Sequence, residues 1–169
     1  MRTMRRTQIA VVVAFLSVGA GSRALAPVTQ VIAQPDAPIR ITSYSAAYQE
    51  GGRYATEGIH HNVAYDSATD RKIVAVQIGL VSFDIWNEFL DRTGGVSMDE
   101  LAPHASSKGT WVARAYADFS FQTGVAYVAK VRFVDGWIWE ADLQSIAEEL
   151  KKIEKDFYVA KLRAKPEKP

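Results

Sequence analysis

Residues 125–141, VAYVAKVRFVDGWIWEA, consist of two strand-like runs joined by Asp135-Gly136. β-Branched and aromatic residues dominate both runs, and an Asp-Gly pair between such runs is a strong signal for a tight β-hairpin. A two-residue type I′ loop predicts that Val134 opposes Trp137 and that Arg132 opposes Trp139. The segment therefore predicts an antiparallel hairpin with a fixed register.

Other strand-length apolar runs precede this hairpin, and turn-forming clusters such as Thr93-Gly94-Gly95 separate them. They cover residues 39–48, 59–65, 72–83 and 110–117. Residues 72–83 are apolar on both faces, which predicts a central strand. Because no helical period holds before Asp142 and no helices alternate with the strands, the pattern favours a two-sheet β-sandwich over residues 39–141.

The hydrophobic period changes after Ala141 and predicts an amphipathic helix over residues 142–163. Asp142 stands at the expected N-cap position. The helix has three open interpretations: it packs on the sandwich, it pairs weakly with a second copy, or it lies on a membrane. Its acidic residues make the membrane interpretation the weakest. Residues 164–169 are predicted to form a disordered tail. The apolar stripe of the helix contains Leu143, Ile146, Leu150, Ile153, Phe157 and Ala160.

The N-terminal residues 1–26 have the layout of a bacterial secretory signal peptide, with an arginine-rich start, a short apolar run and small residues after it. The apolar run is shorter than the roughly 20 residues that span a bilayer. Cleavage after Ala20, Ala26 or Ala33 remains open. Residues 27–38 contain three prolines and predict an extended linker.

Composition limits the partners of the exported chain. Removing residues 1–26 takes away four arginines and leaves 16 Lys+Arg against 19 Asp+Glu, a formal charge of −3. A net acidic chain is a poor partner for nucleic acid or for an anionic membrane. The chain has no cysteine, which excludes disulfides and thiolate chemistry. These features predict a secreted or periplasmic domain that depends on its hydrophobic core and is not inserted in the membrane after cleavage.

The order of these features resembles a bacterial extracytoplasmic immunoglobulin-like domain of the FxLYD type. The resemblance lies in three stretches: Val63-Ala64-Tyr65-Asp66 with Lys72–Val76, Leu80–Asp84, and Leu101-Ala102-Pro103. It covers about residues 59–134. It implies an immunoglobulin-like sandwich and an adhesive or accessory module, and it carries over no catalytic residue.

One candidate ligand-binding surface follows from the predicted hairpin register. Arg132, Trp137 and Trp139 are expected on one face, where two indoles suit stacking on sugar rings or docking of a partner's apolar side chain. Alternatively, the C-terminal helix covers this face with its apolar stripe, because an open tryptophan pair is unusual on a soluble monomer. The second interpretation is favoured.

Metal and catalytic sites have little support in the sequence. His60 and His61 are neighbours, so a strand points them to opposite faces, and His61 is expected in the core. Asp84 and Glu88 form the least implausible carboxylate pair of a small hydrolase, but solvated turn residues are a commoner explanation. No cofactor, metal or catalytic residue is predicted.

The function expected from these features is an exported, non-catalytic binding or scaffolding module for an envelope or extracellular protein or glycan. Carbohydrate binding through Trp137 and Trp139 is the first alternative, and the hydrolase is the second.

Overall fold

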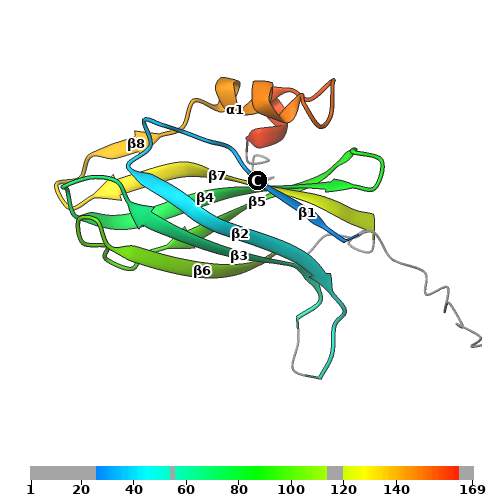
Figure 1. Cartoon of the computed structure of the whole chain (residues 1–169), viewed down its shortest axis with the longest axis horizontal. Helices are drawn as coiled ribbons and strands as arrows, with labels where there is room; N and C mark the ends of the chain where they lie inside the picture. Colours follow the sequence, from blue (N-terminus) through cyan, green and yellow to red (C-terminus); the bar gives the residue numbers. More distant parts are fainter. Residues whose placement is uncertain (1–25, 54–55, 114–119, 164–169) are drawn as a thin grey trace, which may run out of the picture.

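A computed structural model describes residues 26–53, 56–113 and 120–163 of the chain, and it is mainly β (Figure 1). Two sheets pack face to face, which confirms the predicted β-sandwich with a C-terminal helix. The larger sheet contains β1 (Val28–Val31), β4 (Ile73–Asp84), β5 (Phe89–Ser97), β7 (Phe121–Phe133) and β8 (Ile138–Glu140). The smaller sheet contains β2 (Ile39–Gln49), β3 (Gly58–Ser67) and β6 (Ser106–Ala113). Helix α1 (Leu143–Leu150) and the 3-10 helix η2 (Val159–Leu162) follow.

The strand order is β1-β7-β4-β5 in the larger sheet, with β8 also paired to β7, and β2-β3-β6 in the smaller one. β1 runs parallel to β7, while the other described pairs are antiparallel. β4 lies between β7 and β5, which agrees with the central strand expected from its two apolar faces.

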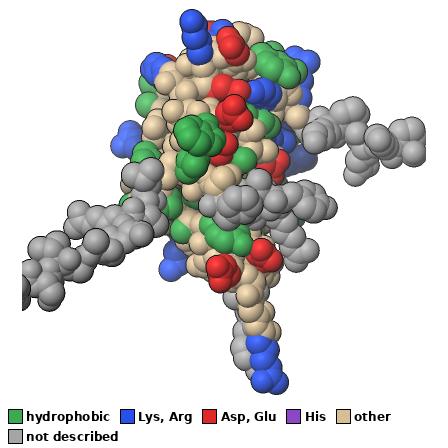
Figure 2. All heavy atoms as spheres, turned by 90° about the vertical axis from the view of Figure 1, so that its right-hand side faces the viewer, with side chains coloured by type: hydrophobic (Ala, Val, Ile, Leu, Met, Phe, Trp, Pro, Cys, Tyr) green, Lys and Arg blue, Asp and Glu red, His purple; other side chains and the backbone are tan. Residues whose placement is uncertain are grey.

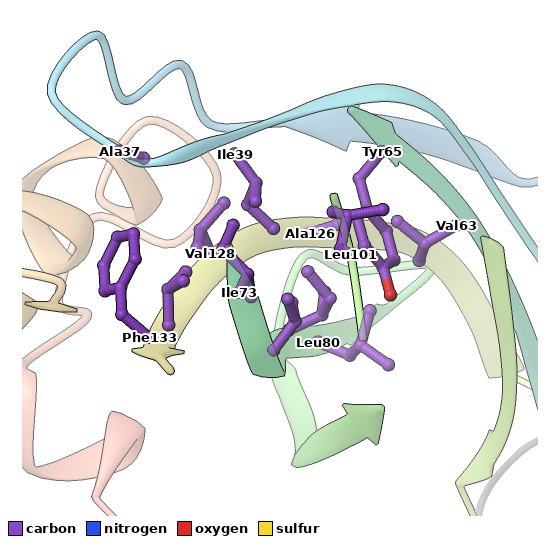
Figure 3. Packing of buried hydrophobic residues seen from close by; sticks show 13 residues of the cluster. Ala37, Ile39, Val63, Tyr65, Ile73, Leu80, Leu101, Ala126, Val128 and Phe133 are labelled. Atoms are coloured by element: carbon purple, nitrogen blue, oxygen red, sulfur yellow. The ribbon is translucent and has the colours of Figure 1, made fainter. Parts of the chain in front are cut away.

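The main core lies between the sheets and is built from the alternate residues that each strand turns inward (Figure 3). Tyr65 from β3, Ile78 and Leu80 from β4, and Phe133 from β7 are all fully buried there. Each large apolar side chain removed from water in this way stabilises the fold by roughly 1.5–3 kcal/mol.

The opposite face of the larger sheet is also buried, because the C-terminal segment covers it (Figure 1). Tyr127 and Ala129 of β7 point to this side, whereas Val131 and Phe133 point into the core between the sheets. The change follows from a bulge in the pairing with β4, where Ile78 faces Val128 but Gln77 faces Lys130. The molecule therefore has three layers: the small sheet, the large sheet and the C-terminal segment.

The predicted hairpin register is wrong by one residue. The structure pairs Val131 with Trp139 and Arg132 with Ile138, and the Phe133 N–H donates to the Trp137 carbonyl. A type I′ loop needs positive φ at both central residues, but of Asp135 and Gly136 only Gly136 has it, at φ 87°. The loop is thus a three-residue one, which places both tryptophans on the side of Val131 and Phe133 rather than on that of Arg132.

The predicted helix over residues 142–163 is too long, and its position differs from the favoured interpretation. Asp142 does cap α1, because its Oδ1 accepts a hydrogen bond from Gln144 N–H at 3.0 Å. The helix ends at Leu150, and turns then carry Phe157 onto the larger sheet. The apolar stripe, apart from the exposed Ala160, packs on Val81, Phe83, Val125, Tyr127 and Ala129 rather than on Trp137 and Trp139.

The predicted linker over residues 27–38 is part of the folded domain. β1 pairs with residues 123–126 of β7, and the Ile32 N–H continues this pairing to the Ala126 carbonyl. The Gln34 side chain then binds both backbone groups of Val128, at 3.0 and 2.7 Å. Ala37 is buried in the main core. Satisfying the edge of β7 explains why this proline-containing segment is ordered.

β5 is a strand that the sequence did not predict, since its centre contains the glycines assigned to a turn. Gly95 faces the ring of Trp111 across the two sheets, and a Cβ there would lie 2.3 Å from that ring. Tertiary packing therefore requires glycine inside this strand.

Deleting residues 1–33 is expected to lower the melting temperature by roughly 10 °C relative to deleting residues 1–26, because β1 and its edge bonds are lost. Thermal circular dichroism of the two purified chains measures the difference. Equal melting temperatures would show that residues 27–33 add nothing to the fold. A loss would also argue against signal cleavage after Ala33.

The predicted signal peptide, apart from Ala26, and the predicted tail lie outside the described residues. Within the described part, no helix is long and apolar enough to cross a membrane.

Candidate functional site

The three residues of the predicted ligand-binding surface do not lie on one face. Arg132 is exposed on the side of the hairpin opposite to Trp137 and Trp139. Trp139 is partly buried against the core between the sheets, while Trp137 is 50% exposed. The predicted face of two indoles and one guanidinium is therefore absent from the described hairpin.

Trp137 takes part in a stack that stabilises the hairpin. Its ring lies 5.1 Å from that of Phe133, and the Arg71 guanidinium lies 3.9 Å from the Phe133 ring and 4.8 Å from the Trp137 ring. Asp135 binds the same guanidinium, and the backbone N–H of Trp137 together with Arg71 lowers the pKa of the Asp135 carboxyl. With its ring already engaged on one side, Trp137 has weaker support as a sugar-stacking platform.

Of the two acidic residues in the hydrolase alternative, Asp84 has a structural role. Asp84 is only 9% exposed, and its Oδ1 accepts hydrogen bonds from the backbone N–H groups of Trp86 and Glu88, both at 2.8 Å. Glu88 is exposed. Asp84 and Glu88 do not line the pocket between β5 and the C-terminal segment, nor three other pockets of the described part of the chain. The geometry explains Asp84 as a turn cap and gives no support to acid–base chemistry.

The two neighbouring histidines point to opposite faces of β3, as predicted. His60 lies at the surface, with Nε2 2.8 Å from the Thr56 carbonyl oxygen. His61 is fully buried, and its Nδ1 lies 2.9 Å from the Tyr44 hydroxyl, whereas its Nε2 has no hydrogen-bond partner. Burial raises the pKa of Tyr44. Across the described residues no group of three potential ligands is placed to hold a metal.

The turn between β4 and β5, residues 84–88, exposes the most accessible tryptophan of the described chain. Trp86 is 76% exposed, and its neighbour Ile85 is 50% exposed. We call residues 84–88 the β4–β5 tip. Figure 2 views the end of the molecule toward which this tip points, where hydrophobic side chains stand between acidic ones. The acidic residues here predicted a solvated turn, and the isolated tryptophan beside turn-forming residues was the signal for an exposed aromatic side chain.

Hydrogen bonds within the tip and to Ser120 satisfy several of its backbone groups. Besides the two bonds to the Asp84 carboxylate, Asp84 N–H donates to the Glu88 carbonyl and Asn87 N–H to the Asp84 carbonyl. Ile85 N–H donates to the Ser120 carbonyl at 3.0 Å. Asn87 adopts the left-handed conformation, with φ 64°, that asparagine tolerates. Asp84 therefore presents Trp86 in one defined turn.

A groove of about 640 Å³ runs beside β5, on the side of the C-terminal segment. Residues 89–94 of β5 form one wall, and Tyr158, Ala160, Lys161 and Arg163 form the other. The sequence did not predict this groove, because it predicted neither β5 nor the end of α1 at Leu150. We call it the β5 groove.

Comparison with known proteins identifies similarity of fold only. The chain matches no protein-family model, and no curated protein sequence matches it significantly. A 1.85 Å X-ray structure of a hypothetical protein from Peptoclostridium difficile 630 is similar, with a TM-score of 0.51 and 9% sequence identity. The similarity covers 71% of this chain and 93% of that chain. At this identity it shows a related fold and assigns no role to any residue.

Proposed function

We propose that this protein is an exported, non-catalytic binding module that docks an envelope or extracellular protein at its β4–β5 tip. The strand order supports an immunoglobulin-like module of the kind implied by the FxLYD resemblance. β2, β3 and β6 correspond to strands A, B and E of that fold, and β5, β4, β7 and β8 correspond to strands C′, C, F and G. Loops at the end of such a sandwich are common binding sites, because a rigid scaffold holds them.

The high exposure of Trp86 is the main support for the proposal. Tryptophan is enriched among the residues that dominate binding energy, since it buries a large surface with few rotatable bonds. The hydrogen bonds of the tip order the turn before binding, which reduces the entropy lost on association. Ile85 beside it extends the apolar contact. The nearby Glu88 suits a partner surface that has a basic rim around an apolar pocket.

Replacing Trp86 by alanine is expected to weaken partner binding about 30-fold, the effect of a hot-spot residue worth about 2 kcal/mol. Because Trp86 is exposed, the melting temperature should change by less than about 2 °C. The tagged protein, immobilised at equal density, is incubated with envelope extract of its host, and retained proteins are quantified by mass spectrometry. The affinity of the leading partner is then measured with purified components.

The matched control is Trp137→Ala, which removes a second exposed tryptophan from the β7–β8 hairpin. It should leave partner binding unchanged. Equal binding by the wild-type protein and Trp86→Ala, or loss with Trp137→Ala alone, would contradict docking at the tip. A glycan array run with the same three proteins separates protein binding from the carbohydrate alternative.

A further inference from the structure

β5 is the outer strand of the larger sheet, and one of its backbone edges is open except at Val96, whose carbonyl accepts a hydrogen bond from Trp111 Nε1. β4 pairs with one edge, and among the described residues no strand pairs with the other (Figure 1). An outer strand presents a row of backbone N–H and C=O groups that another extended chain can pair with. The edge of β7, in contrast, is paired with β1, β8 and the Gln34 side chain. β5 is therefore an available template for strand addition.

The β5 groove lies along this open edge and is basic. Arg92 comes from β5 and Arg163 from the opposite wall, and neither has an ion pair within the described part of the chain. Lys161 adds a third cation, although Glu154 binds it at 2.6 Å. The groove thus has two guanidinium groups available to carboxylates, one on each wall.

Asp91, the acidic residue of the groove wall, does not cancel this charge. It pairs with Ser82, whereas Arg92 pairs with Val81, so the two side chains point to opposite faces of β5. Val81 belongs to the face that the C-terminal segment covers. Arg92 therefore lies on the same face of the sheet as η2 and the opposite wall.

Local packing orients Arg92. It lies next to the buried Tyr127 hydroxyl, and neither that hydroxyl nor the Arg92 Nε has a well-formed hydrogen bond. Tyr127 itself lies flat over Gly79, where an added Cβ would be 2.1 Å from the ring. The Tyr127 ring restricts the position of the Arg92 guanidinium, so we expect its terminal nitrogens to face the groove.

We propose that the β5 groove binds an extended acidic segment of a partner protein, which adds as a strand to the open edge of β5. Alternate side chains of such a strand lie on one face of the sheet, so its carboxylates can face the groove walls that carry Arg92 and Arg163. Opposite charges on neighbouring strands stabilise the pairing. A second copy of this chain is a poorer occupant, because antiparallel pairing of two β5 strands around Arg92 brings like charges together.

This site is separate from the β4–β5 tip, and each proposal can fail without the other. The probe is a fluorescein-labelled peptide of roughly ten residues with alternating Glu and Thr and blocked ends, and its binding to the purified protein is measured by fluorescence anisotropy. Arg92→Glu should weaken binding at least about tenfold, and Arg92→Gln should have an intermediate effect. Trp86→Ala should not change it. A peptide with Lys in place of Glu should not bind.

N-methylation of the peptide tests strand addition directly. Successive amides of a strand point to opposite edges, so methyl groups on one alternate set of amides should abolish binding, and those on the other set should be tolerated. Equal affinities of the two methylated peptides, or equal binding of the Lys and Glu peptides, would overturn the proposal. So would a concentration-dependent dimer in sedimentation that Arg92→Glu strengthens, since the occupant would then be a second copy.

Discussion

Acidification from about pH 7 to about pH 4 is expected to lower the free energy of unfolding by about 3 kcal/mol through His61 alone. Burial, with a smaller contribution from the His60 charge, lowers the pKa of His61 from its ordinary value of 6.5 to about 4. Above pH 6.5 the imidazole is neutral in both states and costs nothing. Below it the unfolded chain binds a proton that the folded chain excludes, so stability falls by about 1.4 kcal/mol per pH unit until the folded pKa is reached.

The pKa shifts of the carboxyl groups act at lower pH than that of His61. Asp135, Asp142 and Glu148 have pKa values lowered by their hydrogen-bond partners, so their contribution to stability is present above their ordinary pKa values, 3.8 for Asp and 4.5 for Glu, and is lost as the pH falls below them. Urea unfolding at several pH values between about 5 and 7 therefore isolates the histidine. A protonated ring donates from both nitrogens: Nδ1–H can donate to the Tyr44 hydroxyl oxygen, but the Nε2 proton has no acceptor in the apolar interior.

His61→Gln should remove most of the pH dependence in this window, although it lowers stability at neutral pH. His60→Gln is the matched control, because His60 sits on the outer face of the same strand and should leave the pH dependence in place. An unchanged profile in His61→Gln would refute the assignment. A histidine NMR titration that gives His61 an ordinary pKa would refute it as well.

Phe157→Ala is expected to destabilise the domain by about 3–5 kcal/mol, the usual cost of deleting a fully buried phenylalanine. Phe157 lies beyond α1, with its ring 5.9 Å from that of Phe83 and 5.8 Å from that of Phe89. It is 1% exposed and joins the C-terminal segment to both β4 and β5. Removing it leaves a cavity between the segment and the larger sheet. Chemical denaturation followed by circular dichroism measures the loss.

Tyr158→Ala is the control for this substitution, because Tyr158 is the next residue and is 57% exposed. It should cost less than about 1 kcal/mol. The native tryptophan emission should not shift to the red in Phe157→Ala, since the C-terminal segment does not cover Trp137 or Trp139. A red shift in the folded variant would favour the original hypothesis that the helix covers these rings.

The candidate sites could be predicted only in part from the sequence. The opposite orientation of His60 and His61 followed from the two-residue period of a strand, which depends on backbone geometry alone. The exposure of Trp86 was not predicted, because exposure at a turn is a property of the folded surface. The β5 groove was out of reach, since its two walls are more than sixty residues apart in the chain.

Sequence by itself determined the class of the fold, the opposite orientation of His60 and His61 on β3, the two apolar faces of β4, and the cap at Asp142. These depend on side-chain alternation and on local hydrogen bonding, which neighbouring residues largely decide. The hairpin register could not be predicted from the sequence, because Asp-Gly fits both a two-residue and a three-residue loop. The three-residue loop is the one found, because it buries Phe133 and partly buries Trp139 in the same core. A slip of one residue would reverse every side chain of the strand.

Tertiary structure alone decided three further features. The Gly94-Gly95 segment is part of a strand, and Gly95 is required there because only glycine leaves room for the ring of Trp111. Residues 28–34 pair with the edge of β7, because its buried backbone groups need hydrogen-bond partners. α1 ends at Leu150, and the chain then turns so that Phe157 packs on the apolar face of β4 and β7. The burial of this apolar surface outweighs the continuation of a short helix.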